Sequence, residues 1–367
     1  MDRRTNIAVV GCGYWGPNLI RNFSGLPDAR LHAICDLDSD RLELFRLRYP
    51  GVRLETDLAR LLLEDELDGV VIATAAPTHF DIVSQVLAAG KHVYVEKPMT
   101  LTVEDAERLV DRADESGRIL MVGHLLEYHP AVEFIKSYIQ SGRLGEVRYI
   151  YTQRLNLGKI RKDENALWSL APHDISVVGY LLGQQPSRVS AVGQSFLQEG
   201  VEDLVFVSLH YRGMQMAHIH VSWLDPHKMR KITVVGSKKM IVFDDMEAAE
   251  KIRIYDKGFD VAEAEFVNDE QSLRIRNGDI LIPRIDDAEP LRLECAQFVR
   301  SIRTGVPPRT DSRDGLRVVE VLAAADASLK SEGHPFPVGS AQDSSTINLP
   351  LANAGRMAPL SPIAAIR

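Results

Sequence analysis

Cysteine is scarce in this chain of 367 residues, with only Cys12, Cys35 and Cys295. No two of them stand in a CxxC spacing, so the sequence offers no zinc-type pair, and an odd count of three does not suggest a disulfide framework. Isolated thiols of this kind are typical of proteins in a reducing compartment. We therefore expect no metal site and a cytoplasmic location.

Long apolar runs and an excess of positive charge are also missing. No segment approaches 18 uninterrupted apolar residues, so we expect no membrane span. Strand-like sequence begins at Asn6, which leaves no room for a secretory signal. The formal net charge of −8 argues against nucleic acid or an anionic membrane as the main partner. With 45% apolar and 26% charged residues, the composition is that of a globular enzyme long enough for two domains.

Short apolar stretches alternate with helical stretches over the first 123 residues. The expected strands are 6–10, 31–35, 70–73, 91–95 and 119–122, and the expected helices are 17–25, 41–49, 79–89 and 103–116. Strands that alternate with helices in this way indicate parallel βαβ units. We therefore predict a doubly wound α/β domain of the Rossmann type over residues 1–123.

The pattern changes after Gly123. Helices are expected at 130–141 and 173–182, an irregular polar segment at 156–168, and strands at 145–154, 188–194, 204–211, 214–222, 230–235 and 239–244. Consecutive strands joined by short turns predict an open, mainly antiparallel sheet in an α+β domain over residues 124–287. Two further helices are expected at 290–304 and 313–330, and an extended tail at 341–367.

A glycine-rich turn follows the first expected strand. Gly11, Gly13 and Gly16 fit GxGxxG, in which the glycines permit a tight turn, close approach of a pyrophosphate, and close helix–strand packing. Asp36 stands 20 residues after Gly16 at the end of the second strand, where a carboxylate can bind a ribose 2′-hydroxyl. Because Leu37 beside it offers no cation for a 2′-phosphate, we predict NAD rather than NADP. The alternative for Asp36 is a simple turn residue.

Two residues carry the predicted chemistry. Lys97 follows a buried strand and precedes Pro98, at the edge where ligands bind in open α/β sheets. His173 lies between Pro172 and an apolar helix, where a neutral imidazole can accept a hydroxyl proton while Lys97 stabilises the alkoxide. The alternative interpretations are a surface cation for Lys97 and a structural histidine for His173. Together with a nucleotide fold, they favour a dehydrogenase acting on an alcohol carbon.

Other polar groups are less specific. His218 and His220 share one strand face but lack a third ligand, so we expect paired sheet residues rather than a metal site. The segment with His124, Tyr128 and His129 follows the fifth strand and is placed at the cleft. Two basic clusters have two readings, solvated loop charge or a diphosphate clamp. Their members are Arg154, Lys159, Arg161 and Lys162, and Lys228, Arg230 and Lys231.

Four segments resemble the Gfo/Idh/MocA family of oxidoreductases: GCGYWG, ATAAPTHFDIVSQVLAAGKHVYVEKPM, SGRLGEVRYI and EPLRLECAQFVRSIRTGVPPRTDSRDGLRVVEVLAAADASL. The resemblance extends to about residue 338. It implies that the last helices pack back on the first domain, that the Lys97–Pro98 peptide is cis, and that homodimers or homotetramers form through the second sheet. Beyond the glycines and Asp36, the residues expected at the cofactor are Tyr14, Trp15, Thr74, Pro77, His79, Glu96 and Lys97.

The family usually has Asp four residues before and three residues after the catalytic histidine, where this chain has Ser169 and Ser176. These departures weaken a transfer of plain sugar or inositol dehydrogenase activity. The segments YTQRLNLGKIRKDENALWSLAPHDIS and SWLDPHKMR are similar to the subgroup that acts at C3 of nucleotide-linked sugars such as UDP-N-acetylglucosamine. The residues expected at the substrate are Arg154, Arg161, Trp168, Ser169 and Asp174.

These observations predict NAD-dependent oxidation of the C3 hydroxyl of a nucleotide sugar. Three alternatives stay open. One is the reverse reaction, a ketoreductase acting on a nucleotide-linked deoxysugar, against which Asp36 argues because such reductases often use NADPH. Another is oxidation of a free sugar or inositol, against which Ser169 counts. The last is a sensor that binds a dinucleotide and a sugar without catalysis, and the presence of both Lys97 and His173 speaks against it.

Overall fold

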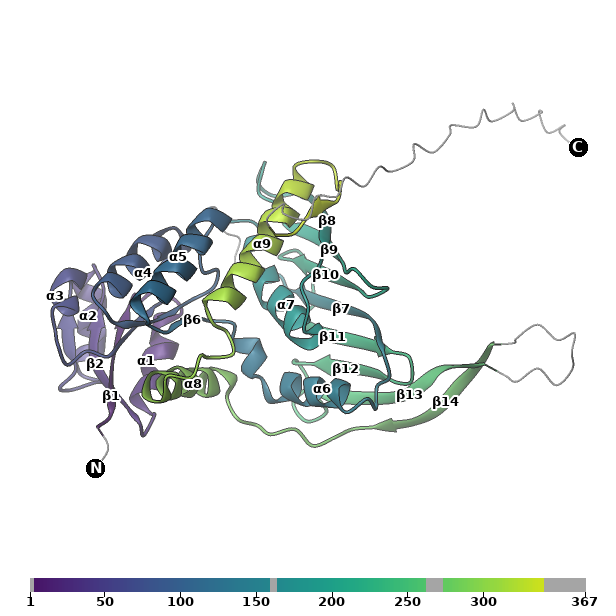
Figure 1. Cartoon of the computed structure of the whole chain (residues 1–367), viewed down its shortest axis with the longest axis horizontal. Helices are drawn as coiled ribbons and strands as arrows, with labels where there is room; N and C mark the ends of the chain where they lie inside the picture. Colours follow the sequence, from purple (N-terminus) through teal and green to yellow (C-terminus); the bar gives the residue numbers. More distant parts are fainter. Residues whose placement is uncertain (1–2, 159–163, 262–272, 340–367) are drawn as a thin grey trace, which may run out of the picture.

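The computed structural model describes residues 3–158, 164–261 and 273–339. Within them the chain forms two sheets, with the N-terminal sheet and its helices at one end of the molecule and a larger sheet at the other (Figure 1). The expected tail at 341–367 and the predicted substrate residue Arg161 lie outside the described residues, as do Lys159 and Lys162.

The first sheet has six strands in the order β3-β2-β1-β4-β5-β6, and every neighbouring pair is parallel. Its strands are β1 (Thr5–Val10), β2 (Ala29–Cys35), β3 (Arg53–Glu55), β4 (Gly69–Ile72), β5 (His92–Val95) and β6 (Leu120–Val122). Its helices are α1 (Gly16–Ser24), α2 (Ser39–Arg46), α3 (Leu58–Leu62), α4 (His79–Ala88) and α5 (Val103–Ser116), with the 3₁₀ turn η1 (Ala76–Thr78).

This arrangement confirms the predicted Rossmann sheet. All residues of β1 and β4 are buried, as expected for parallel strands covered on both faces. The strand order reverses between β1 and β4, and ligands bind at the carboxyl ends of the strands beside such a switch point. The sequence patterns missed β3 and α3, because three and five residues are too short to show a period.

The second sheet has nine strands in the order β14-β13-β12-β11-β7-β10-β9-β8-β15. They are β7 (Val147–Leu155), β8 (Arg188–Gln194), β9 (Leu204–His210), β10 (Met216–Ser222), β11 (Met229–Gly236), β12 (Met240–Asp244), β13 (Ile252–Val261), β14 (Leu273–Leu281) and β15 (Phe336–Pro337). The predicted mainly antiparallel sheet is confirmed, although its two central strands, β7 and β10, run parallel. The helices of this half are η2 (Leu125–Tyr128), α6 (Pro130–Gln140), α7 (Ala166–Leu182), α8 (Pro290–Thr304) and α9 (Ser312–Leu329).

Two predictions for this half were wrong. Helix α7 begins at Ala166 instead of 173, because Asn165 caps it by accepting the Trp168 N–H and Pro172 is tolerated inside it. A proline was taken as the helix boundary, since it has no N–H for the preceding turn. Strands β13 and β14 were not predicted, because polar residues and a glycine interrupt their alternation after Tyr255 and after Arg276.

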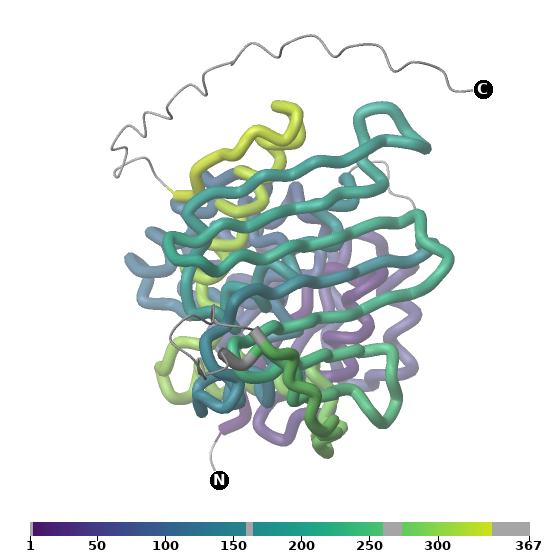
Figure 2. Tube along the Cα trace, turned by 90° about the vertical axis from the view of Figure 1, so that its right-hand side faces the viewer, coloured from purple at the N-terminus to yellow at the C-terminus, as the bar shows by residue number. Residues whose placement is uncertain are grey.

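One face of the large sheet is covered and the other is open. Helix α7 contacts β7, β9 and β10, while α9 contacts β8, so both lie on the same face. Seen from the opposite side, the strands cross the front of the molecule with no helix over them (Figure 2). Helix α8 packs on α1 and β1, and α9 also contacts α5, so the last two helices join the two sheets. No helix in the described ranges is long and apolar enough to cross a membrane.

Candidate active site

The glycine turn between β1 and α1 has a different steric reason for each glycine. Gly11 has φ +96°, and a Cβ there would lie 2.8 Å from the backbone of Ala73. A Cβ on Gly16 would lie 2.0 Å from the carbonyl oxygen of Gly11, so only glycine lets the helix start this close to the strand. A Cβ on Gly13 would meet nothing within 4 Å. The first and third glycines are therefore required by the fold, and the second faces open space that a pyrophosphate fits.

Asp36 stands at the carboxyl end of β2, beside this turn. Its Oδ2 accepts the backbone N–H of Cys12 at 2.6 Å, and its Oδ1 accepts that of Asp38 at 3.0 Å. A carboxylate has about four acceptor positions, so both oxygens keep capacity for ribose hydroxyls. The neighbouring Leu37 is exposed and brings no positive charge.

Two aromatic residues follow the second glycine of the turn. Tyr14 is almost fully exposed on it, whereas Trp15 is partly buried at the start of α1 and packs against the core of the first sheet. Tyr14 is therefore accessible to a ligand bound at the turn. The indole of Trp15 supports the turn from the side of the protein core.

Glu96 closes β5 next to Lys97. Burial raises the pKa of the Glu96 carboxyl to about 7, although the positive charge of Lys97 acts to lower it. The hydroxyl of Tyr94 lies 3.3 Å from Glu96 and 3.0 Å from Glu294, a fully buried carboxyl. One phenol proton cannot serve two carboxylates, and burial raises the pKa of Glu294 well above its ordinary value. Glu96 therefore titrates near neutral pH.

The loop after β4 carries three predicted cofactor residues. Pro77 is exposed, and the hydroxyl of Thr74 lies 2.7 Å from that of Thr78. His79 is 1% exposed, with its Nδ1 at 2.8 Å from the carbonyl of Pro98 and its Nε2 at 3.2 Å from that of Thr74. Direct cofactor contact by His79 has to be revised, because its ring holds this loop against the segment after Lys97.

Lys97 reaches across to the second half of the molecule. The peptide between Lys97 and Pro98 is cis, as the resemblance implied. The Lys97 Nζ donates to the carbonyl of Ser169 at 2.9 Å, which brings the end of β5 against the second turn of α7. His173 follows one helical turn later on α7. The ammonium group and the imidazole therefore belong to one site, although they come from different halves of the molecule.

His173 is partly buried, and its Nδ1 has no hydrogen-bond partner among the described residues. Burial, together with the charges of Lys97, Arg154 and Arg230, holds the pKa of His173 well below its ordinary value. The imidazole is therefore neutral at pH 7 and can accept a proton. The same positive charges oppose its protonation unless an anion offsets them.

The predicted substrate residues on α7 have different surroundings. Trp168 is partly buried and Ser169 is buried, and Ser169 offers its carbonyl to Lys97. Asp174 is 1% exposed, and its Oδ2 accepts from Arg154 Nε at 2.6 Å. The prediction of direct substrate contact by Asp174 is therefore corrected, because its carboxylate neutralises Arg154 and is enclosed by packing.

Arg154 lies beside a second arginine, Arg230, which the sequence analysis placed in the other basic cluster. Arg154 on β7 and Arg230 on β11 are direct cross-strand partners. Arg230 donates to the carbonyls of Leu155 and Met229, and burial first, then Arg154, lowers its pKa to about 10. Of the same cluster, Lys231 pairs with Asp244 and Lys228 is exposed.

Both arginines line a cavity of about 410 Å³ together with His173. His129, from the segment placed at the cleft, lines it too, and Nε2 of His129 lies 3.3 Å from Asp245. The wall also includes Lys251 and four carboxylates, those of Asp245, Asp286, Asp287 and Glu289. Glu289 is bound by Arg21 and Asn22 of α1. This cavity joins a proton acceptor to two cations that a phosphate oxygen can approach.

The comparisons with known proteins match both halves of the chain. A family model described as the oxidoreductase family with an NAD-binding Rossmann fold matches residues 5–124, and a GFO/IDH/MocA C-terminal domain model matches residues 132–242. The chain belongs to the GFO/IDH/MocA oxidoreductase family. Its cofactor is NAD, and the open Gly13 and the Asp36 carboxylate fit this dinucleotide.

Relatives within the family differ in substrate. A UDP-N-acetylglucosamine 3-dehydrogenase of Acidithiobacillus ferrooxidans is 31% identical over 191 residues, which are 50% of this chain and 56% of that protein. A myo-inositol 2-dehydrogenase of Thermotoga maritima is 24% identical over 89% of this chain and 96% of its own. A protein of gentamicin A biosynthesis, solved in complex with NAD, has a TM-score of 0.77 at 24% identity over 93% of this chain and 98% of its own.

Two serines mark where this member of the family departs from the usual aspartates. Ser169 meets Lys97 through its backbone, and the Ser176 hydroxyl donates to Oε1 of Glu127 at 2.7 Å. Glu127 is itself 1% exposed. Sequence patterns gave no signal for Glu127, because an isolated acid in a short segment reads as surface.

The histidines outside this cavity fall into two environments. His124 is 1% exposed, and neither of its ring nitrogens has a hydrogen-bond partner within the described part of the chain. Burial lowers the pKa of His124 to about 4, and the charge of nearby Lys97 adds to the effect. His218 and His220 stack on Phe206, with ring centroids 5.9 and 4.3 Å away.

Proposed function

We propose that this protein oxidises the C3 hydroxyl of a nucleotide-linked sugar of the UDP-N-acetylglucosamine type, using NAD. The observation that carries the proposal is the cross-strand pair of Arg154 and Arg230 beside His173 in one cavity. Paired guanidinium groups suit the oxygens of a diphosphate. Asp174 pairs with Arg154, whereas Arg230 donates to two backbone carbonyls, so Arg230 is the guanidinium group that a phosphate oxygen would approach.

Lys97 and His173 divide the chemistry of the oxidation. Bound NAD supplies the nicotinamide that accepts a hydride. The C3–H bond breaks with its electron pair leaving as that hydride, while the hydroxyl proton passes to His173 and a carbon–oxygen double bond forms. Lys97, already donating to a carbonyl in the site, stabilises the negative charge that develops on the C3 oxygen.

The charges around His173 link proton transfer to substrate binding. Lys97, Arg154 and Arg230 lower the pKa of this imidazole. A diphosphate held by the arginines offsets part of that charge, so the pKa of His173 rises when the substrate binds. His173 thereby becomes a better proton acceptor only in the substrate complex, which a neutral polyol would not achieve. The 31% identity to a UDP-N-acetylglucosamine 3-dehydrogenase adds support.

Oxidation of a free polyol is the second candidate, because the match to a myo-inositol dehydrogenase covers nearly the whole chain. The test measures NADH formation with UDP-, dTDP- and GDP-sugars beside free hexoses and inositols. We expect a signal with a nucleotide sugar only, lost in Lys97→Ala and kept in Lys91→Ala. Lys91 lies just before β5, the strand that ends beside Lys97, and donates to the carbonyl of Glu64. It is therefore a matched control.

Three other results would contradict the proposal. A signal with a free hexose or inositol would establish the second candidate. A signal only when a keto-sugar and NADH are supplied would indicate a reductase. Tight binding of NAD and sugar without turnover, unchanged in Lys97→Ala, would indicate a sensor.

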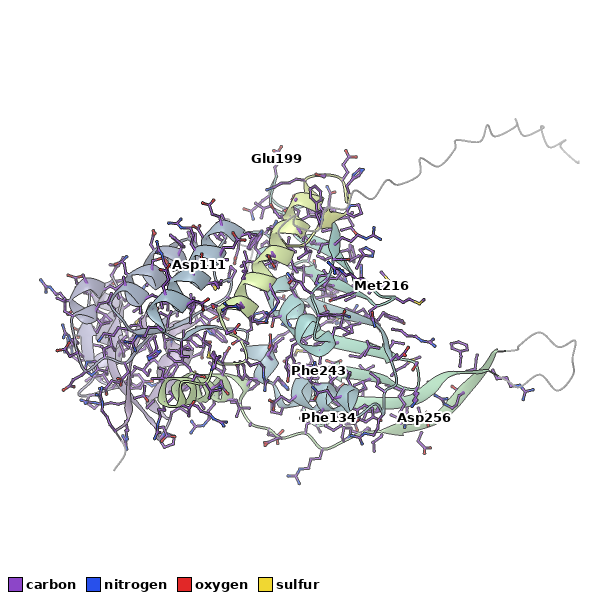
Figure 3. All side chains as sticks on the ribbon, in the orientation of Figure 1. Asp111, Phe134, Glu199, Met216, Phe243 and Asp256 are labelled. Atoms are coloured by element: carbon purple, nitrogen blue, oxygen red, sulfur yellow. The ribbon has the colours of Figure 1, made fainter. Side chains whose placement is uncertain are left out.

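The open face of the large sheet supports a homodimer or homotetramer as part of the same proposal. Tyr149 and Tyr151 of β7 stack on this face, and Met216 of β10 is 42% exposed beside them (Figure 3). An uncovered aromatic patch of this kind is typical of a protein–protein interface. Light scattering should show a smaller assembly for Tyr149→Asp. Met214→Asp, in the fully exposed turn before β10, should leave the assembly unchanged. A monomeric wild type would refute this part.

A further inference from the structure

A second cavity, of about 560 Å³, lies along α7 and shares no lining residue with the first. Helix α7 contributes Ser176 and Gly179, which follow His173 along the helix, and Gly183, which caps the end of α7, lines the cavity too. Helix α9 and the end of β9 form other parts of the wall. The volume falls within the range of about 300–1,000 Å³ for ligand pockets.

Gly179 has no steric reason to be a glycine. It lies in the interior of α7, its φ is not positive, and a Cβ there would meet nothing within 4 Å. A glycine in a helix interior is destabilising relative to alanine. The chain thus carries a destabilising residue whose structural effect is to leave this cavity wider.

Tyr211 places a buried polar group at the same cavity. The residue is 6% exposed, and its hydroxyl has no hydrogen-bond partner within residues 3–158, 164–261 and 273–339. Burial of an unpaired hydroxyl is unfavourable, because the group loses its hydrogen bonds to water. A ligand hydroxyl or anion in the cavity would remove that cost, so this side chain points to a polar occupant.

Positive charge predominates in the lining. Lys136, Arg309 and Arg317 are its three cations, and Arg317 bonds Asp314 at 2.8 Å. Burial, and then the charge of Asp314, raises the pKa of Glu127 well above its ordinary value. Arg309 also pairs with Glu133, which lies outside the lining. The three cations outnumber the two carboxyl groups of the lining, Glu127 and Asp314, which favours an anion.

The remaining lining indicates the body of the ligand. Gln184 and Gln185 add amide groups that pair with hydroxyls, although Gln185 also donates to Glu320. The apolar floor is made by Ile175, Leu209, Val318 and Val321. Amides and a phenol over an apolar floor suit a polyhydroxylated ring.

We propose that this cavity is a second binding site, separate from the catalytic one, for a sugar acid or a sugar phosphate. The ligand's anionic group lies among the cations, and its hydroxyls bind Tyr211 and the amides. This site does not depend on the proposed oxidation, because none of its lining residues takes part in that reaction.

Calorimetric titration of the full-length protein tests the proposal with D-glucuronate and D-glucose 6-phosphate, and with D-glucose as the neutral match. We expect at least one anion to bind, with glucose at least about tenfold weaker, a difference of ~1.4 kcal/mol. Gly179→Leu, which fills the cavity, should abolish the binding, and Tyr211→Phe should weaken it severalfold. Gly179→Ala should bind with an affinity between those of the wild type and Gly179→Leu, and Lys97→Ala should bind as the wild type does.

Several results would overturn the proposal. One is the absence of saturable heat with both anions. Another is unchanged binding in Gly179→Leu together with Tyr211→Phe. Binding lost in Lys97→Ala but retained in Gly179→Leu would assign the ligand to the catalytic cavity instead. Thermal unfolding of Gly179→Leu beside Gly179→Ala separates a filled cavity from a misfolded helix, and Tyr211→Phe gives an independent test.

Discussion

The two ends of the active site are built in opposite ways. At the cofactor end, the turn from Gly11 to Gly16 is one short segment whose glycines are needed because backbone approaches backbone. At the chemical end, Lys97 bonds the carbonyl of Ser169, 72 residues away, and Arg154 meets Arg230 across two strands. The first end is a property of local chain geometry, and the second exists only when the two halves are joined.

This difference teaches which features of a site leave a mark in the sequence. A turn that admits only glycine must show glycine at fixed spacing. Two arginines on neighbouring strands meet whenever the strand register places them side by side. Many different spacings in the sequence satisfy that requirement. The chemical end is therefore more sensitive to changes in charge, and the cofactor end to changes in side-chain volume.

The largest expected effect is at the chemical end. His173→Asn removes the proton acceptor, and general-base catalysis contributes about 10²–10⁴-fold, so kcat should fall by about that factor. NADH formation with the active nucleotide sugar measures it, and NAD binding should stay unchanged, because the turn at Gly11 is untouched. A kcat within tenfold of the wild type would remove His173 from the reaction.

The cofactor end of the site should be disrupted by added side-chain volume. In Gly16→Ala, the new Cβ would overlap the carbonyl of Gly11, and such overpacking costs about 1–3 kcal/mol. Thermal unfolding and NAD affinity should both decrease. Gly13→Ala is the matched control, since its Cβ meets no protein atom within 4 Å. We expect it to lower NAD affinity while leaving stability intact. If both variants behave alike, the steric distinction between the glycines is wrong.

Arg230→Gln tests the charges at the chemical end. Losing one charged hydrogen bond to a diphosphate costs about 1.5–3 kcal/mol, or about 10- to 100-fold in KM. Removing the positive charge also raises the pKa of His173, so the acid limb of kcat/KM moves to higher pH. The neighbouring Lys231 pairs with Asp244, so Lys231→Gln should change neither the KM nor the pH of the acid limb. An unmoved acid limb in Arg230→Gln would contradict the electrostatic link.

The smallest effect concerns acid stability. The pKa of His124 is about 4 in the folded protein, below the ordinary 6.5, so the unfolded state binds this proton first. The free energy of unfolding therefore falls as pH drops from about 6.5 to 4, by up to ~1.4 kcal/mol per unit. The difference in the free energy of unfolding between pH 7 and pH 5, measured with urea, should be smaller in His124→Asn than in the wild type. His92, with the same lowered pKa outside the site, keeps its share in that variant. An unchanged difference would exclude His124.

Much of the fold was predictable, because repeated burial leaves a period. The helices at 103–116 and 290–304 and the strand at 188–194 were predicted to the residue. The start of α7 was not, since Pro172 disguises the interior of a helix that Asn165 caps. Strands β13 and β14 were missed because polar residues and a glycine interrupt their alternation after the first four residues.

The site was predictable in part, for a related reason. Lys97 and His173 stand out because the strand and the helix that carry them are apolar around a polar residue. His79 and Asp174 were taken for ligand-binding groups, whereas the packed structure buries them against a loop and against Arg154. A polar side chain at a strand end can face a ligand or a neighbouring segment, and the sequence does not distinguish these.

The sequence by itself determined the parallel first sheet, its glycine turn and the NAD cofactor, because these depend on backbone geometry and on periodic burial within short segments. Only the tertiary structure decided which charges meet. It paired Arg154 with Asp174, set Arg230 beside it, and opened a second cavity at Gly179. Electrostatic partners and cavities depend on distances between side chains far apart in the chain, and strand register and helix packing set those distances.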